Sequence, residues 1–208
     1  MHAAASMNPE QTLELARRGD AEALGRLLET YRNYLAILAR VEIDRRLQSK
    51  VDASDVVQDA FLHATRAFPQ FHGTGEGEIL RWLRQILRHR LVDMIRQFYG
   101  THSRDIRLER QLDEDLDRSS CVVRALFDSK TSPSRQVARR EQAVLVADAL
   151  ARLPDDHRDV IVLHEFEGLS LAEVARRMGR SESSVERLWV RSLVGLRGLL
   201  GEKGDELT

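Results

Sequence analysis

The sequence predicts an all-α protein built from two small helical domains that a flexible linker joins. Charged residues make up 31% of the 208 residues and aromatic residues only 5%, which favours helices over sheets. Apolar residues recur at intervals of three and four along most of the chain, and no alternating strand pattern appears. This periodicity weakens over residues 99–132, which we interpret as a linker with room for a short helix between domains at 1–98 and 133–208.

The first domain is expected to be a series of helices separated by short turns. One helix ends at Gly19, and Asp20 then caps a long helix through "AEALGRLLETYRNYLAILARVEIDRRL". The next begins at Asp52, with Asp55 in its first turn, where the helix dipole favours anions. A Pro/Gly-rich loop, "PQFHGTGEGE", leads into a basic helix, "ILRWLRQILRHRLVDMIRQF".

The second domain is expected to contain four helices. The first has Ser132 as its cap and Pro133 at its first position. The second is opened by Pro154 and two aspartates and is closed by Gly168. The last two lie in "SLAEVARRMGRSESSVERLWVRSL".

These last two helices have the pattern of a helix-turn-helix unit. Ser170 and Glu173 have the spacing of a capping box, and Gly179 falls at the turn, where a positive φ favours glycine. Ala175 is small where two helices approach, and Val185 returns to the core. This spacing is typical of units whose second helix enters the major groove of DNA. An ordinary helical hairpin with solvated arginines is the simpler alternative.

The exposed side of the second helix offers groups that reach phosphates and guanine edges. They are Ser183, Ser184, Glu186, Arg187 and Arg191. Residues 171–197 contain six arginines and three glutamates, whereas the whole chain has a net charge of −1. A basic surface therefore arises from local segregation of charge.

The basic helix of the first domain carries a second arginine-rich surface. Its regularly spaced arginines are Arg81, Arg84 and Arg88, and the neighbouring aromatic residues are Phe68, Phe71 and Trp82. Such a helix can hold a nucleic-acid backbone while unstacked bases find aromatic partners. Each aromatic residue taken singly is more simply interpreted as part of the core.

Several protein classes are excluded or disfavoured. The single cysteine, Cys121, excludes a disulfide framework and a cysteine-based zinc site, which indicates a reduced cytoplasmic compartment. No run of 18 apolar residues suits a membrane span, and "MHAAASMNPEQ" lacks the features of a signal peptide. The stretch "HEFEG" at His164 lacks the second histidine of a zinc site, and "HGTGEGE" lacks the ending of a phosphate-binding loop. We therefore expect no enzyme, no metal and no cofactor.

Three blocks of the sequence resemble, in order, the extracytoplasmic-function (ECF) sigma factors of bacterial RNA polymerase. They are "DASDVVQDAFLHATRAFPQF", "WLRQILRHRLVDMIR" and "LPDDHRDVIVLHEFEGLSLAEVARRMGRSESSVERLWVRSLVGLR". The resemblance covers residues 13–97 and 132–200. It implies a first domain that docks on the β′ clamp helices of core polymerase and helps melt the −10 element. The second domain would sit on the β flap and read the −35 element of promoter DNA.

The resemblance also implies three sets of functional residues. The polymerase-binding set is Asp52, Asp55, Gln58 and Asp59, of which Asp52 and Asp55 also suit simple helix capping. The −10 set is Arg84, Arg88, His89, Asp93 and Arg96. The −35 set is Arg180, Ser181, Ser183, Ser184, Glu186, Arg187 and Arg191.

The chain departs from the family pattern at four positions. His89 stands where Asn is common, Glu186 where a base is common, and Leu188 where Arg is common. These changes bear on promoter choice. Ser54 stands where Glu is usual, and we hypothesise that phosphorylation by a kinase would restore the negative charge. An ordinary serine at a helix start is the alternative, and an anti-sigma factor is a further partner that the family implies.

A conventional helix-turn-helix regulator that binds DNA as a dimer, without polymerase, is the rival interpretation. It would need a sensing or dimerising domain before the linker. The first domain instead places an acidic block beside a basic helix, which suits a polymerase subunit better.

Overall fold

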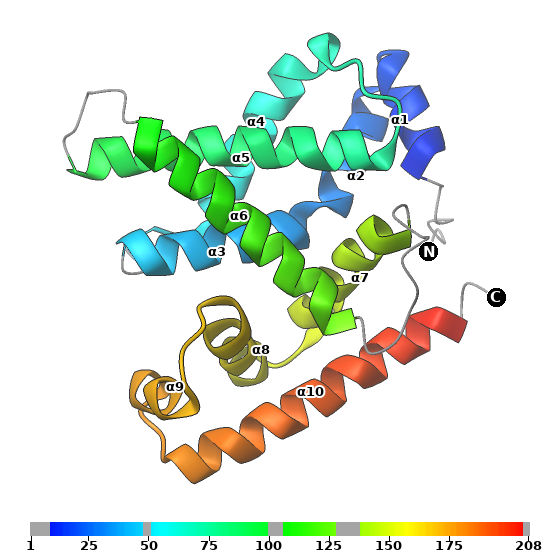
Figure 1. Cartoon of the computed structure of the whole chain (residues 1–208). Helices are drawn as coiled ribbons and strands as arrows, with labels where there is room; N and C mark the ends of the chain where they lie inside the picture. The colour runs from blue at the N-terminus through cyan, green and yellow to red at the C-terminus, as the bar shows by residue number, and fades with distance from the viewer. Residues whose placement is uncertain (1–8, 48–50, 100–105, 128–137, 206–208) are drawn as a thin grey trace. The chain divides into compact units, whose positions relative to one another are not determined.

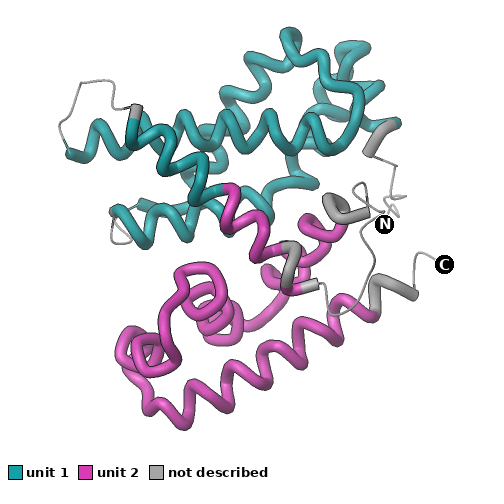
Figure 2. Tube along the Cα trace, in the orientation of Figure 1, with its two compact units in different colours: residues 1–116 teal, residues 117–208 magenta. Residues whose placement is uncertain are grey.

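The computed structural model describes residues 9–47, 51–99, 106–127 and 138–205 (Figure 1). All regular secondary structure within these ranges is helical, which confirms the predicted fold class. The chain divides into two compact units, Met1–Leu116 and Asp117–Thr208 (Figure 2). None of the described helices is long and apolar enough to cross a membrane.

The first unit is organised around α3, α4 and α5. Its helices are α1 (Pro9–Arg17), α2 (Ala21–Thr30), α3 (Arg32–Leu47), α4 (Ala53–Ala67), the 3₁₀ turn η1 (Phe68–Gln70) and α5 (Glu76–Tyr99). α1 packs on α2, while α4 packs on both α3 and α5 (Figure 1). Leu38 of α3 and Leu87 and Leu91 of α5 are completely buried, so the core of the unit lies between these helices.

The long helix expected after Asp20 is two helices, α2 and α3, which meet at Tyr31. Asp20 caps α2 as predicted, because its side chain accepts a hydrogen bond from Ala23 N at 2.9 Å. Tyr31 has φ −98° and ψ 0°, which ends the regular helix, and its side chain is completely buried. The bend lets α2 pack on α1 while α3 turns toward α4 and α5. No glycine or proline marks this break, so periodicity alone missed it.

The segment interpreted as a linker contains a 22-residue helix, α6 (Ile106–Phe127). The boundary between the two compact units falls within this helix, between Leu116 and Asp117. Leu112 and Leu116 are buried, although the acids around them hid this apolar spacing in the sequence. Several of those acids form ion pairs with arginines of α3 and α5, which are distant in the sequence. The helix therefore depends on tertiary partners that a local pattern does not reveal.

The second unit contains the remaining helices. They are α7 (Ala138–Arg152), α8 (Asp155–Ile161), the π-helical turn η2 (Val162–Phe166), α9 (Leu171–Met178) and α10 (Glu182–Asp205). α10 packs against α7, α8 and α9. Pro154 precedes α8 as predicted, and Gly168 after η2 has φ +73°. The helix start predicted at Ser132 and Pro133 lies outside the described residues.

Candidate functional site

The predicted helix-turn-helix is present as α9 and α10, and its frame has the expected chemistry. Ser170 Oγ accepts a hydrogen bond from Glu173 N at 3.3 Å, and the Glu173 carboxylate accepts one from Ser170 N at 2.9 Å. Hydrogen bonds from the Ser170 hydroxyl, and then from its backbone, lower the pKa of Glu173. Gly179 ends α9 with φ +65°, and Val185 is completely buried. The capping box and the turn glycine are both confirmed.

The predicted DNA-contacting side of α10 faces solvent. Ser183, Glu186, Arg187 and Arg191 are exposed, and Ser184 is half-buried. Among the described residues, no hydrogen bond or ion pair involves the side chain of Arg187 or Arg191. These guanidinium groups are therefore available to an external anion.

The two −35 residues before α10 have local structural roles. Arg180 forms an ion pair with Asp156 of α8, which ties the turn back to the body of the unit. Ser181 immediately precedes α10, and its carbonyl accepts the hydrogen bond from Val185 N at 3.1 Å. Ser181 therefore occupies the N-cap position of α10.

A polar cluster that the sequence reasoning missed fixes the orientation of α10. Trp189 Nε1 donates to Glu165 Oε1 at 3.3 Å, and the His164 ring packs edge-on against the Trp189 ring at 5.3 Å. One turn further, the buried Ser192 hydroxyl lies 2.9 Å from His157 Nδ1. These contacts hold one side of α10 on α8 and η2, so its arginine side points away. The sequence signal for this cluster was the position of Trp189 four residues after Val185, which places both side chains on the same side of the helix.

Three of the predicted polymerase-binding residues share one face of α4. They are Asp55, Gln58 and Asp59, whose spacing of three and four residues places them on adjoining turns. Leu62 extends the same face by one turn and is 54% exposed, which is unusual for leucine on a packed helix. The sequence analysis did not include Leu62. The available signal was its position seven residues after Asp55, which places both side chains on the same face of the helix. The face therefore combines carboxylates with one apolar side chain.

Asp52 and Asp59 are also engaged in contacts within the chain. Asp52 is the N-cap of α4, and its side chain accepts from Ser54 N at 2.8 Å, which confirms the capping role. Asp59 Oδ2 lies 3.8 Å from a terminal nitrogen of Arg90 on α5. The Ser54 side chain is exposed.

The arginines of the predicted −10 set on α5 are covered by acids of α6. The Arg88 side chain is 13% exposed, with its Nε 3.4 Å from Asp113 Oδ1 and a terminal nitrogen 3.8 Å from Glu109 Oε2. The Arg96 side chain is 21% exposed and donates to Glu109 Oε1 at 3.0 Å. The sequence reasoning did not foresee this cover, because it placed the α6 segment in a linker.

The other members of the −10 set differ in exposure and charge. Arg84 is half-buried, and Asp93 is half-exposed and bonds Arg90 at 2.7 Å. His89 lies at the surface, with Nε2 2.9 Å from a terminal nitrogen of Arg88. Partial desolvation, and then the charge of Arg88, lower the pKa of His89, so its neutral form is favoured at pH 7.

The aromatic residues beside α5 pack on one another. The ring centroids of Phe71 and Trp82 are 4.9 Å apart, and those of Phe68 and Phe71 are 6.0 Å apart. Phe68 is buried, and the other two are half-buried. The arrangement agrees with the interpretation of these residues as core.

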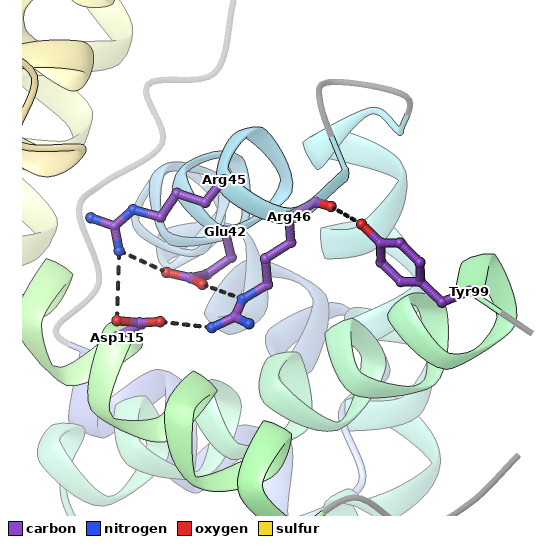
Figure 3. A network of polar contacts seen from close by, with 5 residues as sticks. All are labelled: Glu42, Arg45, Arg46, Tyr99 and Asp115. Carbon is purple, nitrogen blue, oxygen red and sulfur yellow. Dashed lines mark hydrogen bonds and ion pairs between the residues drawn. The ribbon is translucent and has the colours of Figure 1, made fainter. Parts of the chain in front are cut away.

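A second group of contacts joins α6 to α3 (Figure 3). Arg46 donates to Asp115 Oδ2 at 2.7 Å and to Glu42 Oε2 at 3.2 Å, and a terminal nitrogen of Arg45 lies 3.7 Å from Asp115 Oδ1. Tyr99 Oη donates to the Arg46 carbonyl at 2.6 Å. Glu42 is 1% exposed, and burial is the largest cause that raises its pKa. The network fastens residues 106–116 of α6 to α3 as well as to α5.

No group of histidine, cysteine or carboxylate side chains within the described ranges is arranged to hold a metal ion. Three surfaces of the described helices carry charged groups in a position to bind a partner. They are the exposed face of α4, the covered arginines of α5 and the open arginines of α10.

Comparison with known families divides the chain in two. The family model described as "Sigma-70 region 2" matches residues 27–98, and the one described as "Sigma-70, region 4" matches residues 143–194. The first match lies within unit 1 and carries the surfaces of α4 and α5. The second lies within unit 2 and contains the helix-turn-helix.

Individual relatives cover most of the chain. "ECF RNA polymerase sigma-E factor" from Haemophilus influenzae is 30% identical over 84% of this chain and 86% of its own length. "ECF RNA polymerase sigma factor BldN" from Streptomyces coelicolor is 30% identical over 91% of this chain. The chain spans 65% of the length of BldN and 43% of the length of "Probable RNA polymerase sigma factor RfaY" from Xanthomonas campestris. A structure of CnrH in complex with the cytosolic domain of CnrY aligns with 93% of this chain and 97% of its own, at 25% identity and a TM-score of 0.35.

Proposed function

The chain belongs to the extracytoplasmic-function group of the sigma-70 family, and we propose that it is an alternative sigma factor for bacterial RNA polymerase. In this role it would direct promoter-specific initiation and catalyse no reaction itself. One observation carries the proposal: a region 2 match and a region 4 match occur in one chain, each on its own compact unit. The two halves provide separate surfaces for two promoter elements.

The first functional domain, residues 1–98, binds core polymerase through α4. Asp52, Asp55, Gln58 and Asp59 face the β′ clamp helices, and Leu62 adds an apolar contact beside them. Exposed carboxylates opposite a basic partner steer encounter and fix register more than they add affinity. The exposure of Asp55, Gln58 and Leu62 supports this assignment.

The same domain binds the −10 element through α5. Arg84, Arg88 and Arg96 are the cations that neutralise phosphates, while His89 and Asp93 lie beside them and face the bases. A neutral imidazole at His89 can donate or accept a hydrogen bond, or stack on a base, without adding charge. The unstacked strand is the natural target, because single-stranded bases expose the edges that such side chains read.

The second functional domain, residues 133–208, reads the −35 element with the start of α10. Arg187 and Arg191 are open to phosphates or guanine edges, and Ser183 and Ser184 are short donors beside them. Arg180 and Ser181 shape the turn that presents α10. Glu186 is suited to accept a hydrogen bond from cytosine N4 and repels a phosphate placed there.

Each half makes a weak contact by itself, and core polymerase holds the two at a fixed separation. Tethering raises the effective concentration of the second contact once the first has formed. The free chain is therefore expected to bind duplex DNA poorly, with a strong dependence on salt.

In vitro transcription with purified core polymerase on a library of promoter fragments tests the proposal. We expect start sites that require both this chain and core enzyme, and co-purification of the chain with core. If the chain ignores core polymerase and shifts duplex DNA alone as a dimer, it is a conventional helix-turn-helix regulator and the proposal is wrong.

A further inference from the structure

One face of α6 combines buried leucines with the acids that engage α5. Glu109, Leu112, Asp113 and Leu116 recur at intervals of three and four residues, so they lie on one side of the helix. Leu112 is completely buried and Leu116 is 1% exposed. We call residues 106–116 of α6 the acidic cover.

The acidic cover engages two cations that the proposed function assigns to the −10 strand. Glu109 lies within ion-pair distance of both Arg88 and Arg96, and Asp113 within that distance of Arg88. A carboxylate and a DNA phosphate compete for the same guanidinium donors. DNA therefore cannot take the positions of these carboxylates while the cover is in place.

The contacts of the cover with α5 are incomplete, which favours exchange. The Nε groups of Arg88 and Arg96 are buried and make no hydrogen bond among the described residues, although Arg88 Nε lies 3.4 Å from Asp113 Oδ1. A buried donor without an acceptor carries a desolvation cost. A phosphate, with more acceptor oxygens than one carboxylate shared by two arginines, is suited to satisfy such donors.

The cover is also held more by side chains than by close helix packing. Among the described helices, α6 belongs to none of the closely packed helix pairs. Long arginine side chains span the gap: those of Arg88 and Arg96 from α5, and that of Arg46 from α3 to Asp115 (Figure 3). Removing the cover from α5 therefore breaks ion pairs, which salt and competing anions weaken, and it also exposes the buried side chains of Leu112 and Leu116.

We propose that the acidic cover is an intramolecular competitor of DNA, which keeps the arginines of α5 closed in the free chain and is displaced when the −10 strand binds. The identity of the competing nucleic acid rests on the proposed function. While most free molecules have the cover closed, a change in the cover that lowers the ratio of closed to open molecules and leaves the arginines intact strengthens DNA binding by the same factor. The chain thus limits its own binding to stray nucleic acid before core polymerase supplies additional contacts.

The test compares Glu109→Gln with Glu114→Gln in the full chain. Both substitutions remove one negative charge from the same helix, but Glu114 is exposed and has no polar partner among the described residues. Binding of a fluorescent single-stranded oligodeoxynucleotide of mixed sequence is followed by anisotropy. We expect Glu109→Gln to bind about three- to tenfold more tightly than the unaltered chain, and Glu114→Gln to match the unaltered chain.

The salt dependence of binding provides a second measurement. Arg88→Ala combined with Arg96→Ala removes two phosphate contacts from the complex, so the slope of log K against log salt should become shallower by about 1.4. Combining Glu109→Gln with these two substitutions should abolish the gain in affinity for the oligonucleotide. Asp113→Asn, which leaves the first turn of α6 unchanged, should give a smaller gain in the same direction.

The displacement itself is tested by hydrogen exchange. Adding the oligonucleotide should raise amide exchange in residues 106–116. Equal affinities for Glu109→Gln and Glu114→Gln, or unchanged exchange in the cover at saturating oligonucleotide, would overturn the proposal. Transcription with core polymerase is measured in parallel. If the chain initiates transcription but Glu109→Gln does not bind the oligonucleotide more tightly, the proposal about the acidic cover is wrong and the proposed function stands.

Discussion

The arginines of α5 and those of α10 lie on helices of similar length, yet their surroundings are opposite. Arg88 is 13% exposed and faces Glu109 and Asp113, whereas Arg187 and Arg191 are exposed and have no partner within the described residues. The difference arises from the neighbouring elements: an acidic helix lies against α5, while α8 and η2 contact α10 on its other side. Similar basic helices therefore present one closed and one open surface.

The contrast teaches that an arginine row in the sequence specifies charge but not availability. At α10, the contacts of Trp189 and Ser192 turn the arginine side outward. At α5, ion pairs give the arginines a structural role in addition to any role in DNA binding. Mutations on the two helices should therefore separate binding from stability in different ways.

The largest expected effect is loss of the frame that keeps α10 open. Val185→Asp buries a carboxylate at a completely buried position and should lower the free energy of unfolding of unit 2 by about 4 kcal/mol. Val190→Asp is the matched control, because Val190 lies on the same helix and is 53% exposed. Urea unfolding followed by circular dichroism should show a change within about 0.5 kcal/mol for the control. Equal destabilisation by the two variants would contradict this view of α10.

The next effect distinguishes the closed arginines from the open ones. Arg88→Ala should lower the free energy of unfolding by about 1–2 kcal/mol, because it removes one of the two cationic partners of the part-buried Glu109 and the partner of Asp113. Arg187→Ala removes the same side chain from an open position and should leave unfolding unchanged. It should instead weaken binding of polymerase holoenzyme to a −35 duplex by about tenfold. If both variants changed stability alike, the distinction between closed and open surfaces would be wrong.

The pH dependence of stability tests the polar network around Glu42, which joins α6 to α3. Burial raises the pKa of Glu42 above 4.5, so the folded state favours its protonated form. Its contribution to stability is therefore present below the unfolded pKa and is lost as pH rises through the folded value. Relative to Glu42→Gln, the unaltered chain should lose stability as pH rises above 4.5. A stability difference that stays constant between acid and neutral pH would contradict this expectation.

The smallest effect concerns the exposed face of α4. If Ser54 is phosphorylated in use, added negative charge should strengthen docking on core polymerase. Ser54→Glu should then bind core about threefold more tightly than Ser54→Ala in a fluorescence titration. Equal affinities of the two variants would rule out the phosphorylation hypothesis and leave Ser54 as an ordinary residue at a helix start.

Local signals predicted the elements that depend on neighbours in the sequence. The cap at Asp52, the capping box at Ser170 and Glu173 and the positive φ of Gly179 are all confirmed, because each involves a few consecutive residues. The break at Tyr31 was missed because it depends on which helices α2 and α3 pack against. The length of α6 was missed because its acids find partners far away in the sequence.

The helical class, the helix-turn-helix and the family resemblance could be predicted from the sequence, because periodicity, caps and motif order are properties of short stretches. Which arginines are available depends on how the helices pack. Arg88 and Arg187 look alike in the sequence, but α6 brings carboxylates to the first, and Trp189 and Ser192 turn the second toward solvent. Electrostatic environment and burial depend on distances in space, and residues distant in the sequence set those distances.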